Sequence, residues 1–194
     1  MTGFNRAQLV TFVRAIDRHL AARATVLLVG GAAAAIGYDS GTMTADIDIL
    51  NVVAGSPRAI LAASERARVE TGLGVSVGGS PVTELPYDYE DRIKPVRLRL
   101  SKLTLLVPDK YDLVLSKTLR GYPHDIDAIE GVHRQHRLSR KVLIGRFEAE
   151  LVNVATGDPR RTRLNMAMVV ARLYGVEQAR KLAELWGLPV PKGR

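Results

Sequence analysis

Hydrophobic residues recur along the first half of the chain at two spacings, one typical of helices and one typical of strands. Apolar residues three or four positions apart predict an amphipathic helix over residues 5–22. Short apolar runs rich in β-branched residues predict strands at 25–29 and 46–53. Between these strands, Gly30-Gly31 turns the chain into a short helix of small residues at 32–36. Strands and helices that alternate in this way indicate an α/β fold.

The rest of the chain is predicted to add one helix and three strands to the core and then to continue as helices only. Ser56-Pro57 is a typical helix start, and we expect this helix to continue to about residue 70. Further strands are predicted at 75–77, 96–100 and 103–107, the second of them with a basic outer face. The pattern thus predicts a mixed sheet flanked by helices in an α/β core over residues 1–125, followed by a C-terminal helical region over 126–194. The helices expected after residue 109 span 110–120, 125–135, 139–154, 160–174 and 176–185.

Two aspartates inside an apolar strand are the first candidates for chemistry. Alternation along the strand places Asp46 and Asp48 on one face, and Ile47 and Ile49 on the other. Like charges at this spacing repel each other unless a cation lies between them. Carboxylate oxygens suit Mg²⁺, which is commonly held by carboxylates together with substrate phosphates. The pair therefore indicates metal-dependent phosphoryl chemistry, although a solvent-facing strand end with two ordinary carboxylates gives the same pattern.

A glycine pair precedes the aspartates by one strand. Gly30-Gly31 follows a strand and opens a helix, so its backbone can approach a phosphate closely. The spacing matches neither the dinucleotide-binding fingerprint nor the P-loop. A simple tight turn remains the alternative for the glycines taken alone. Thr44, on the same strand face as Asp46, either contacts a bound phosphate or caps the strand.

Charge is distributed unevenly along the 194 residues, whose formal net charge is +8. Residues 1–91 sum to −3 and residues 92–194 to +11, which favours a polyanionic partner such as RNA, DNA or a nucleotide. The alternatives are a solvated basic surface, or a basic surface that binds an acidic protein partner. The absence of cysteine excludes disulfides and thiolate chemistry. With no signal peptide and no membrane span evident, we expect a cytoplasmic protein with no membrane partner.

Basic and histidine residues cluster in the second half. His133 and His136 have a spacing that metal ligands can use, but without cysteines a structural zinc site is not expected. The low aromatic content of 5% argues against a platform that stacks single-stranded bases. The candidate surface for a nucleic acid, or alternatively a solvated helix face, comprises Arg134, Arg137, Arg140, Lys141, Arg160, Arg161 and Arg163.

One run of elements consists of a strand, Gly30-Gly31, a small-residue helix and then Thr44-Ala45-Asp46-Ile47-Asp48. This run resembles the nucleotidyltransferase fold of the polymerase-β type. The chain is most similar to minimal bacterial nucleotidyltransferase-like proteins, which are related to toxins of toxin–antitoxin and abortive-infection systems. A second shared stretch runs over residues 108–120 and continues through His124-Asp125-Ile126-Asp127. The resemblance covers about residues 20–140.

The resemblance implies a role for each matching residue. The nucleoside triphosphate would be bound by Gly30, Gly31, Thr44 and Arg120. Two Mg²⁺ ions would take part in turnover. In the catalytic set, Asp46 and Asp48 would be the metal ligands, and Lys117 would be the cation that neutralises phosphate charge. Asp125 would be a later carboxylate that binds metal or acts as a base, and Asp127 is the alternative residue for this role.

Two departures from the family pattern bear on activity. The strand expected at 96–100 has arginines where many relatives carry a third catalytic carboxylate. Gly41-Thr42-Met43 stands where relatives often have arginine. The resemblance implies an enzyme that moves a nucleoside monophosphate from an NTP to an acceptor hydroxyl and that acts as a toxin restrained by an antitoxin. The basic second half favours RNA, such as a tRNA 3′ end, as the acceptor, and a protein side-chain hydroxyl is the alternative. The alternatives are a non-catalytic binding or regulatory protein and, less compatible with the basic second half, an antibiotic-modifying enzyme.

Overall fold

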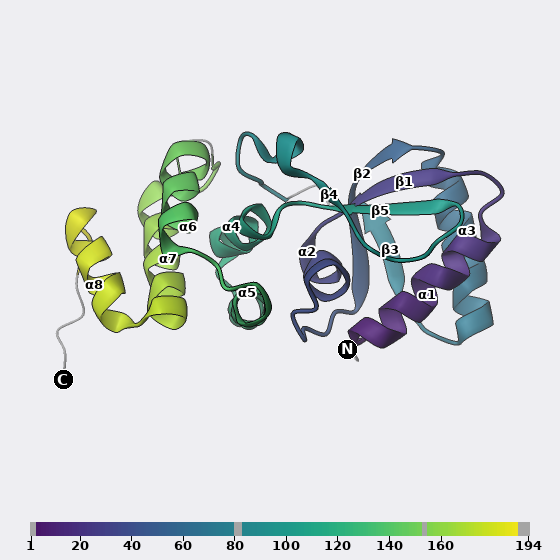
Figure 1. The fold of residues 1–194 in the computed structure, drawn as a ribbon, viewed down its shortest axis with the longest axis horizontal. Helices are drawn as coiled ribbons and strands as arrows, with labels where there is room; N and C mark the ends of the chain where they lie inside the picture. Colours follow the sequence, from purple (N-terminus) through teal and green to yellow (C-terminus); the bar gives the residue numbers. More distant parts are fainter. Residues whose placement is uncertain (1–2, 80–82, 153–154, 190–194) are drawn as a thin grey trace.

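A mixed five-stranded sheet lies at the centre of the α/β part of the computed structural model (Figure 1). The structure describes residues 3–79, 83–152 and 155–189. The strand order is β3-β2-β1-β5-β4, in which β1 is antiparallel to β2 and parallel to β5. The strands are β1 (Ala24–Leu28), β2 (Asp46–Ala54), β3 (Ser76–Gly79), β4 (Lys94–Pro95) and β5 (Leu103–Val107).

Helices α1 (Arg6–His19) and α3 (Pro57–Thr71) lie side by side on one side of the sheet (Figure 1). The start of α1 is fixed by a capping box, in which Asn5 and Gln8 each accept a hydrogen bond from the other's backbone N–H. Ser56 caps α3 in a similar way by accepting from the Ala59 N–H. The helix starts read from the sequence are therefore confirmed.

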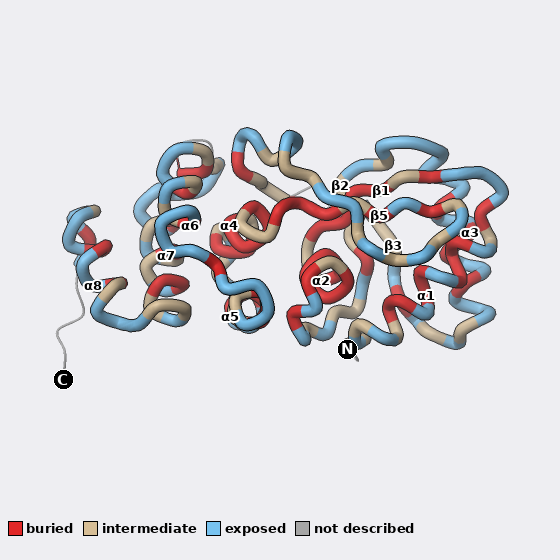
Figure 2. Tube along the Cα trace, in the orientation of Figure 1, coloured by how far each residue is buried: buried red, intermediate tan, exposed pale blue. Residues whose placement is uncertain are grey.

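The glycine pair begins a short buried helical segment. Helix α2 (Gly30–Ala32) continues directly into the π-helical turn η1 (Ala33–Gly37). The alanines of this segment are fully buried, so their small side chains let the backbone pack closely against its neighbours. Figure 2 shows α2 as one of the most completely buried parts of the molecule. The small-residue helix predicted after the first strand is thereby confirmed.

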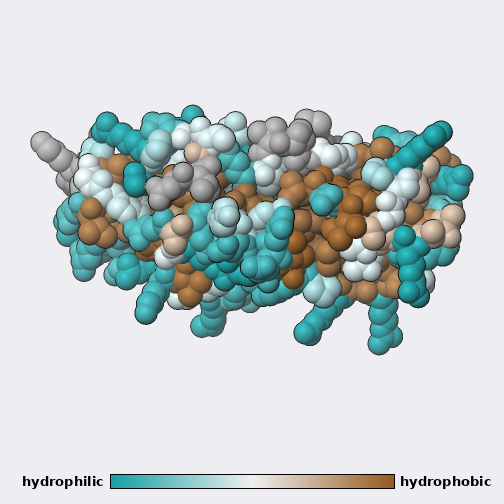
Figure 3. All heavy atoms as spheres, turned by 90° about the horizontal axis from the view of Figure 1, so that it is seen from above, coloured by the Kyte–Doolittle hydropathy of each residue, from teal (hydrophilic) through white to brown (hydrophobic). Residues whose placement is uncertain are grey.

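The C-terminal helices extend the molecule away from α1 and α3 (Figure 1). Helix α4 packs against α5, α6 and α7, and a single cluster of buried apolar side chains runs from α1 to α8. On the face seen in Figure 3, hydrophilic side chains cover most of the helical half, whereas apolar ones gather over part of the α/β half. The elements are α4 (Lys110–Arg120), α5 (Pro123–His136), α6 (Arg140–Arg146), η3 (Phe147–Leu151), α7 (Pro159–Tyr174) and α8 (Val176–Leu185), with a short 3₁₀ turn η2 (Tyr89–Arg92) before β4.

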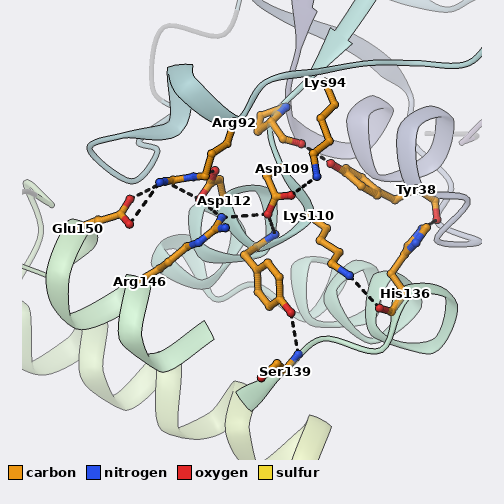
Figure 4. Close-up of polar contacts among 12 residues, drawn as sticks. Tyr38, Arg92, Lys94, Asp109, Lys110, Asp112, His136, Ser139, Arg146 and Glu150 are labelled. Atoms are coloured by element: carbon orange, nitrogen blue, oxygen red, sulfur yellow. Dashed lines mark hydrogen bonds and ion pairs between the residues drawn. The ribbon is translucent and has the colours of Figure 1, made fainter. Parts of the chain in front are cut away.

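A buried ion-pair network fastens the segment before β4 to α4 and to the α6–η3 helix (Figure 4). Arg92 Nε lies 2.9 Å from Asp112 Oδ2, and the same guanidinium also bonds Glu150. Arg146 bridges Asp109 and Asp112 at 2.9 and 3.0 Å. Because Asp112 is fully buried between two arginines, this network holds the start of α4, and with it the rest of that helix, in a fixed place.

The strand predicted at 96–100 is wrong, because only Lys94–Pro95 forms β4. The Val96 N–H still bonds Leu105, at 2.9 Å, but the chain then leaves the sheet. The carboxylate of Asp17 in α1 accepts hydrogen bonds from the backbone N–H groups of residues 101–103, so a side chain takes the place of a neighbouring strand there.

The other predicted elements are confirmed within a few residues of their bounds. The helix predicted over 139–154 is divided into α6 and η3, and residues 153–154 lie outside the described part of the chain. The same holds for residues 190–194 of the predicted C-terminal region. Residue 125, the predicted end of the core, lies in the first turn of α5. None of the helices in the described ranges is long and apolar enough to cross a membrane.

Candidate active site

Asp46 and Asp48 lie at the start of β2 on the sheet face that is turned toward α4. Ile47 and Ile49, which alternate with them, are buried in the core, whereas Asp46 is exposed and Asp48 is half-buried. The two carboxylates border the same hollow as Lys117 and Arg120 of α4. The alternation predicted from the sequence is thus confirmed, and it directs both acids into a space between the sheet and the helices.

The glycine pair lies directly against the aspartate motif. Gly30 has a φ of +64°, and a Cβ at this residue would lie 2.5 Å from Asp48 Oδ2. A Cβ at Gly31 would lie 2.6 Å from Thr44 Oγ1, which itself donates a 2.8 Å hydrogen bond to Asp46 Oδ1. Two glycines are therefore needed for the backbone to approach the carboxylates and Thr44 this closely.

Opposite the carboxylates, a buried aspartate holds two cationic side chains. Lys117 Nζ donates to Asp125 Oδ1 at 3.0 Å. Arg120 bonds both oxygens of Asp125, at 2.6 and 3.1 Å. Lys117 is 3% exposed and Asp125 is fully buried, whereas 44% of the Arg120 side chain is exposed. Residues of α4 three positions apart share a face, so Asp125 fixes both cations on the side that faces the hollow.

Burial and neighbouring charges shift the pKa values of two groups in this arrangement. Burial, and then the nearby charge of Asp46, raise the pKa of the Asp48 carboxyl above its usual value, although Arg120 and Lys117 oppose the shift. Burial lowers the pKa of the Lys117 ammonium, while its contact with Asp125 opposes this change. A cation beside Asp48 would relieve the repulsion that raises its pKa.

Three hollows meet at Arg120. The largest, of about 540 Å³, contains the aspartate motif, Gly31, Lys117 and His124. A second hollow of about 200 Å³ extends from Gly30 and Lys117 toward Glu84 and Thr156. A third, of about 410 Å³, is bordered by Tyr122 and Arg161. Together they provide space on both sides of Arg120 for a ligand that interacts with the carboxylates.

The donor set is compatible with Mg²⁺ only if a ligand completes it. Asp46 and Asp48 supply hard carboxylate oxygens on one strand face. Within the described ranges, no group of three or more histidine, cysteine, aspartate or glutamate side chains could hold a metal ion. Because Mg²⁺ is commonly held by one or two carboxylates together with phosphates and water, a nucleotide would provide the remaining ligands.

The other predicted residues occupy distinct places. Asp127 is exposed, on a different face of α5 from the buried Asp125. His133 Nδ1 accepts a hydrogen bond from the Leu138 N–H, and His136 Nε2 lies 2.9 Å from the Tyr38 carbonyl oxygen. These two histidines thus have separate partners. The basic residues of the candidate nucleic-acid surface are exposed except for half-buried Arg163, and Arg161 alone among them borders the hollows at Arg120.

Sequence reasoning missed several residues that border these hollows. Glu84 accepts hydrogen bonds from the backbone and side chain of Thr156, which joins the segment after β3 to the start of α7. Tyr122 and Ser116 also lie beside Arg120 or Lys117. Nothing in local spacing marks Glu84 or Thr156, because they are more than seventy residues apart in sequence. Tyr122 could have been noticed as an aromatic residue between the Lys117-x-x-Arg120 and His124-Asp125 stretches.

Comparison with known proteins identifies one related family. A family model described as "Nucleotidyltransferase of unknown function (DUF6036)" matches residues 7–171. The matched region contains both carboxylates, the glycine pair, Lys117, Arg120 and Asp125. No curated protein and no solved structure matches the chain.

Proposed function

Because the chain belongs to a family of nucleotidyltransferases of unknown function, we propose that it is a Mg²⁺-dependent enzyme that moves a nucleoside monophosphate from an NTP to an acceptor hydroxyl. The observation that supports this most is the position of Asp46 and Asp48, which face Lys117 and Arg120 across one hollow. Acidic side chains on one wall suit a metal, and cations on the other suit phosphates.

In this proposal, each residue of the hollow has a defined task. Gly30 and Gly31 let the backbone approach the triphosphate, and Thr44 orients Asp46 through its hydrogen bond. Lys117 and Arg120 neutralise charge that develops on the phosphates as the bond to pyrophosphate breaks. The acceptor oxygen forms the new bond to the α-phosphorus, pyrophosphate departs and the hydroxyl proton passes to solvent.

Asp46 and Asp48 would hold Mg²⁺, and two Mg²⁺ ions would take part in turnover. Bound Mg²⁺ supplies Lewis-acid stabilisation of the phosphate oxygens. We assign Asp125 a different task from the metal ligand or base expected from the family resemblance. It is fully buried and both its oxygens are bonded to Lys117 and Arg120, so it acts as a positioning residue for these cations.

RNA is the acceptor that we propose, in particular a tRNA 3′ end. Residues 92–194 have a net charge of +11, and six of the seven arginine and lysine residues of the candidate nucleic-acid surface are exposed. By the family resemblance, modification of RNA would make the protein a toxin that an antitoxin partner restrains. A hydroxyl on a protein side chain is the alternative acceptor.

The test is to incubate the protein with each α-labelled NTP, Mg²⁺ and total tRNA. The matched control is the Asp46→Asn/Asp48→Asn variant, which removes two charges with little change in volume. We expect label on RNA only with the unsubstituted protein. Label on the protein would assign a side chain as the acceptor, and no label from any NTP with a folded protein would contradict the proposal.

A non-catalytic binding protein is the second candidate, and one feature of the sheet favours it. Strand β3 pairs in parallel with β2, and it places Ser76 opposite Asp46 and Gly78 opposite Asp48. The neighbouring strand therefore brings no third carboxylate to the pair. Release of pyrophosphate separates the two candidates, because a binding protein would bind NTP and Mg²⁺ without producing it.

A further inference from the structure

Two aromatic rings stack on each other at the edge of the candidate active site. The rings of Tyr122 and His124 have centroids 5.6 Å apart and planes inclined by only 20°. Both are accessible, since Tyr122 is 54% exposed and the His124 side chain 71% exposed. The Tyr122 side chain makes no capping hydrogen bond to α5, although Tyr122 occupies the capping position. The pair is therefore not explained by a need to start the helix.

The stacked pair links the hollows on either side of Arg120. His124 borders the hollow that contains Asp46 and Asp48. Tyr122 borders the hollow that contains the exposed Arg161. A chain that passes over the pair would thus have a carboxylate pair at one end and a cation for its backbone phosphate at the other.

We propose that Tyr122 and His124 form a stacking platform for an unpaired nucleobase of the acceptor RNA. The choice of RNA rests on the function proposed above. Unstacked bases at single-stranded ends commonly bind aromatic faces, and such stacking tolerates any base. The low aromatic content of the chain fits a platform for one base at the acceptor end and not a long single-strand groove.

The position of the platform favours the acceptor over the incoming nucleotide. Tyr122 borders neither of the hollows that contain Gly30 or Gly31, the glycines that the proposed function assigns to the triphosphate, whereas His124 borders the one that contains Gly31 and the carboxylates. Both residues of the platform are more than half exposed to solvent. An acceptor strand, which must enter from solution to reach the carboxylates, would meet these rings on its way.

Binding of a short fluorescein-labelled single-stranded RNA to the full chain, followed by fluorescence anisotropy, tests the platform without requiring catalysis. We expect Tyr122→Ala to weaken binding about tenfold, and Tyr122→Phe, which retains the ring, to bind as the unsubstituted protein does. His124→Ala should weaken binding in the same direction. Binding of a blunt RNA duplex, which offers phosphates but no unstacked base, should not change in any variant.

Several outcomes would overturn the platform. They are equal RNA binding by Tyr122→Ala, no RNA binding by the unsubstituted protein, and a loss of NTP binding in Tyr122→Ala with RNA binding intact. Thermal unfolding of each variant shows whether it is folded. If Tyr122→Ala is unfolded, Tyr122→Phe and His124→Ala still test the platform. RNA binding that depends on the Tyr122 ring, in a protein that transfers no label, would contradict the proposed activity and support the platform.

Discussion

Lys117 Nζ lies 3.0 Å from Asp125 Oδ1, and both side chains are buried. A lysine in such a place loses hydration, which lowers its pKa, and the aspartate opposes this loss. Asp125 therefore favours the charged form of Lys117 at a position where burial disfavours it. Arg120, bonded to the same carboxylate, extends this positive charge toward solvent.

Asp125→Asn should reduce transfer activity, and the reduction should grow as the pH rises. Without the aspartate charge the pKa of Lys117 falls further, so the ammonium deprotonates at a lower pH than in the unsubstituted protein. The measurement is the transfer rate as a function of pH for both proteins. Asp127→Asn, on an exposed face of the same helix, is the matched control. An unshifted alkaline limb in Asp125→Asn would contradict this role.

Gly30→Ala should reduce both stability and activity more than a glycine-to-alanine substitution at an ordinary helix end does. Gly72 has almost the same backbone conformation, with a φ of +65° against +64°, but no atom lies within 4 Å of the place that a Cβ would occupy there. Gly72→Ala should cost only the left-handed conformation, about 1 kcal/mol. Gly30→Ala also forces the Asp48 carboxylate to move, so we expect a larger loss of stability and at least about tenfold lower activity. Denaturant unfolding and transfer rates check both, and equal losses in the two variants would oppose this account.

Asp48→Asn should stabilise the metal-free protein at neutral pH. The pKa of Asp48 is raised by folding, so the folded state binds this proton more tightly than the unfolded state. The resulting stability is present below the unfolded-state pKa and is lost as the pH rises through the folded-state pKa. The melting temperatures of the two proteins should therefore converge at low pH and separate above it.

Mg²⁺ should act in the opposite direction on the same pair. A cation bound by Asp46 and Asp48 stabilises only the folded state, so Mg²⁺ should raise the melting temperature of the unsubstituted protein more than that of Asp48→Asn. Thermal unfolding with and without Mg²⁺ measures this difference. Equal shifts in both proteins would show that the pair does not hold the ion.

The chain encodes the carboxylate face of the site locally and the rest of the site through tertiary contacts. Alternation along one strand is sufficient to place Asp46 and Asp48 on a common face, and the position of Gly30-Gly31 between two elements is enough to single it out. The strand predicted at 96–100 does not form, and the backbone that follows it, at residues 101–103, is bonded by Asp17, more than eighty residues away. Such a side-chain contact leaves no periodic signal in the sequence.

The cation side of the site shows the same division. Lys117 and Arg120 stand out in the sequence only because the Lys-x-x-Arg stretch resembles that of a known family. Their shared partner, Asp125, is expected from that resemblance to be a ligand or base, and its buried contact with both cations depends on how α5 folds back against α4. Neither this contact nor the stacking of Tyr122 on His124 can be inferred from spacing alone.

Asp112→Ala should destabilise the protein strongly although Asp112 lies outside the site. Its fully buried carboxylate accepts hydrogen bonds from Arg92 and Arg146, and removal of one partner from a buried ion pair leaves charge without compensation (Figure 4). We expect a loss of about 3–5 kcal/mol in the free energy of unfolding, measured with denaturant. Asp91→Ala, at an exposed aspartate beside Arg92, should cost less than about 0.5 kcal/mol. A loss at Asp112 no larger than that at Asp91 would mean that the network contributes little to holding α4 in place.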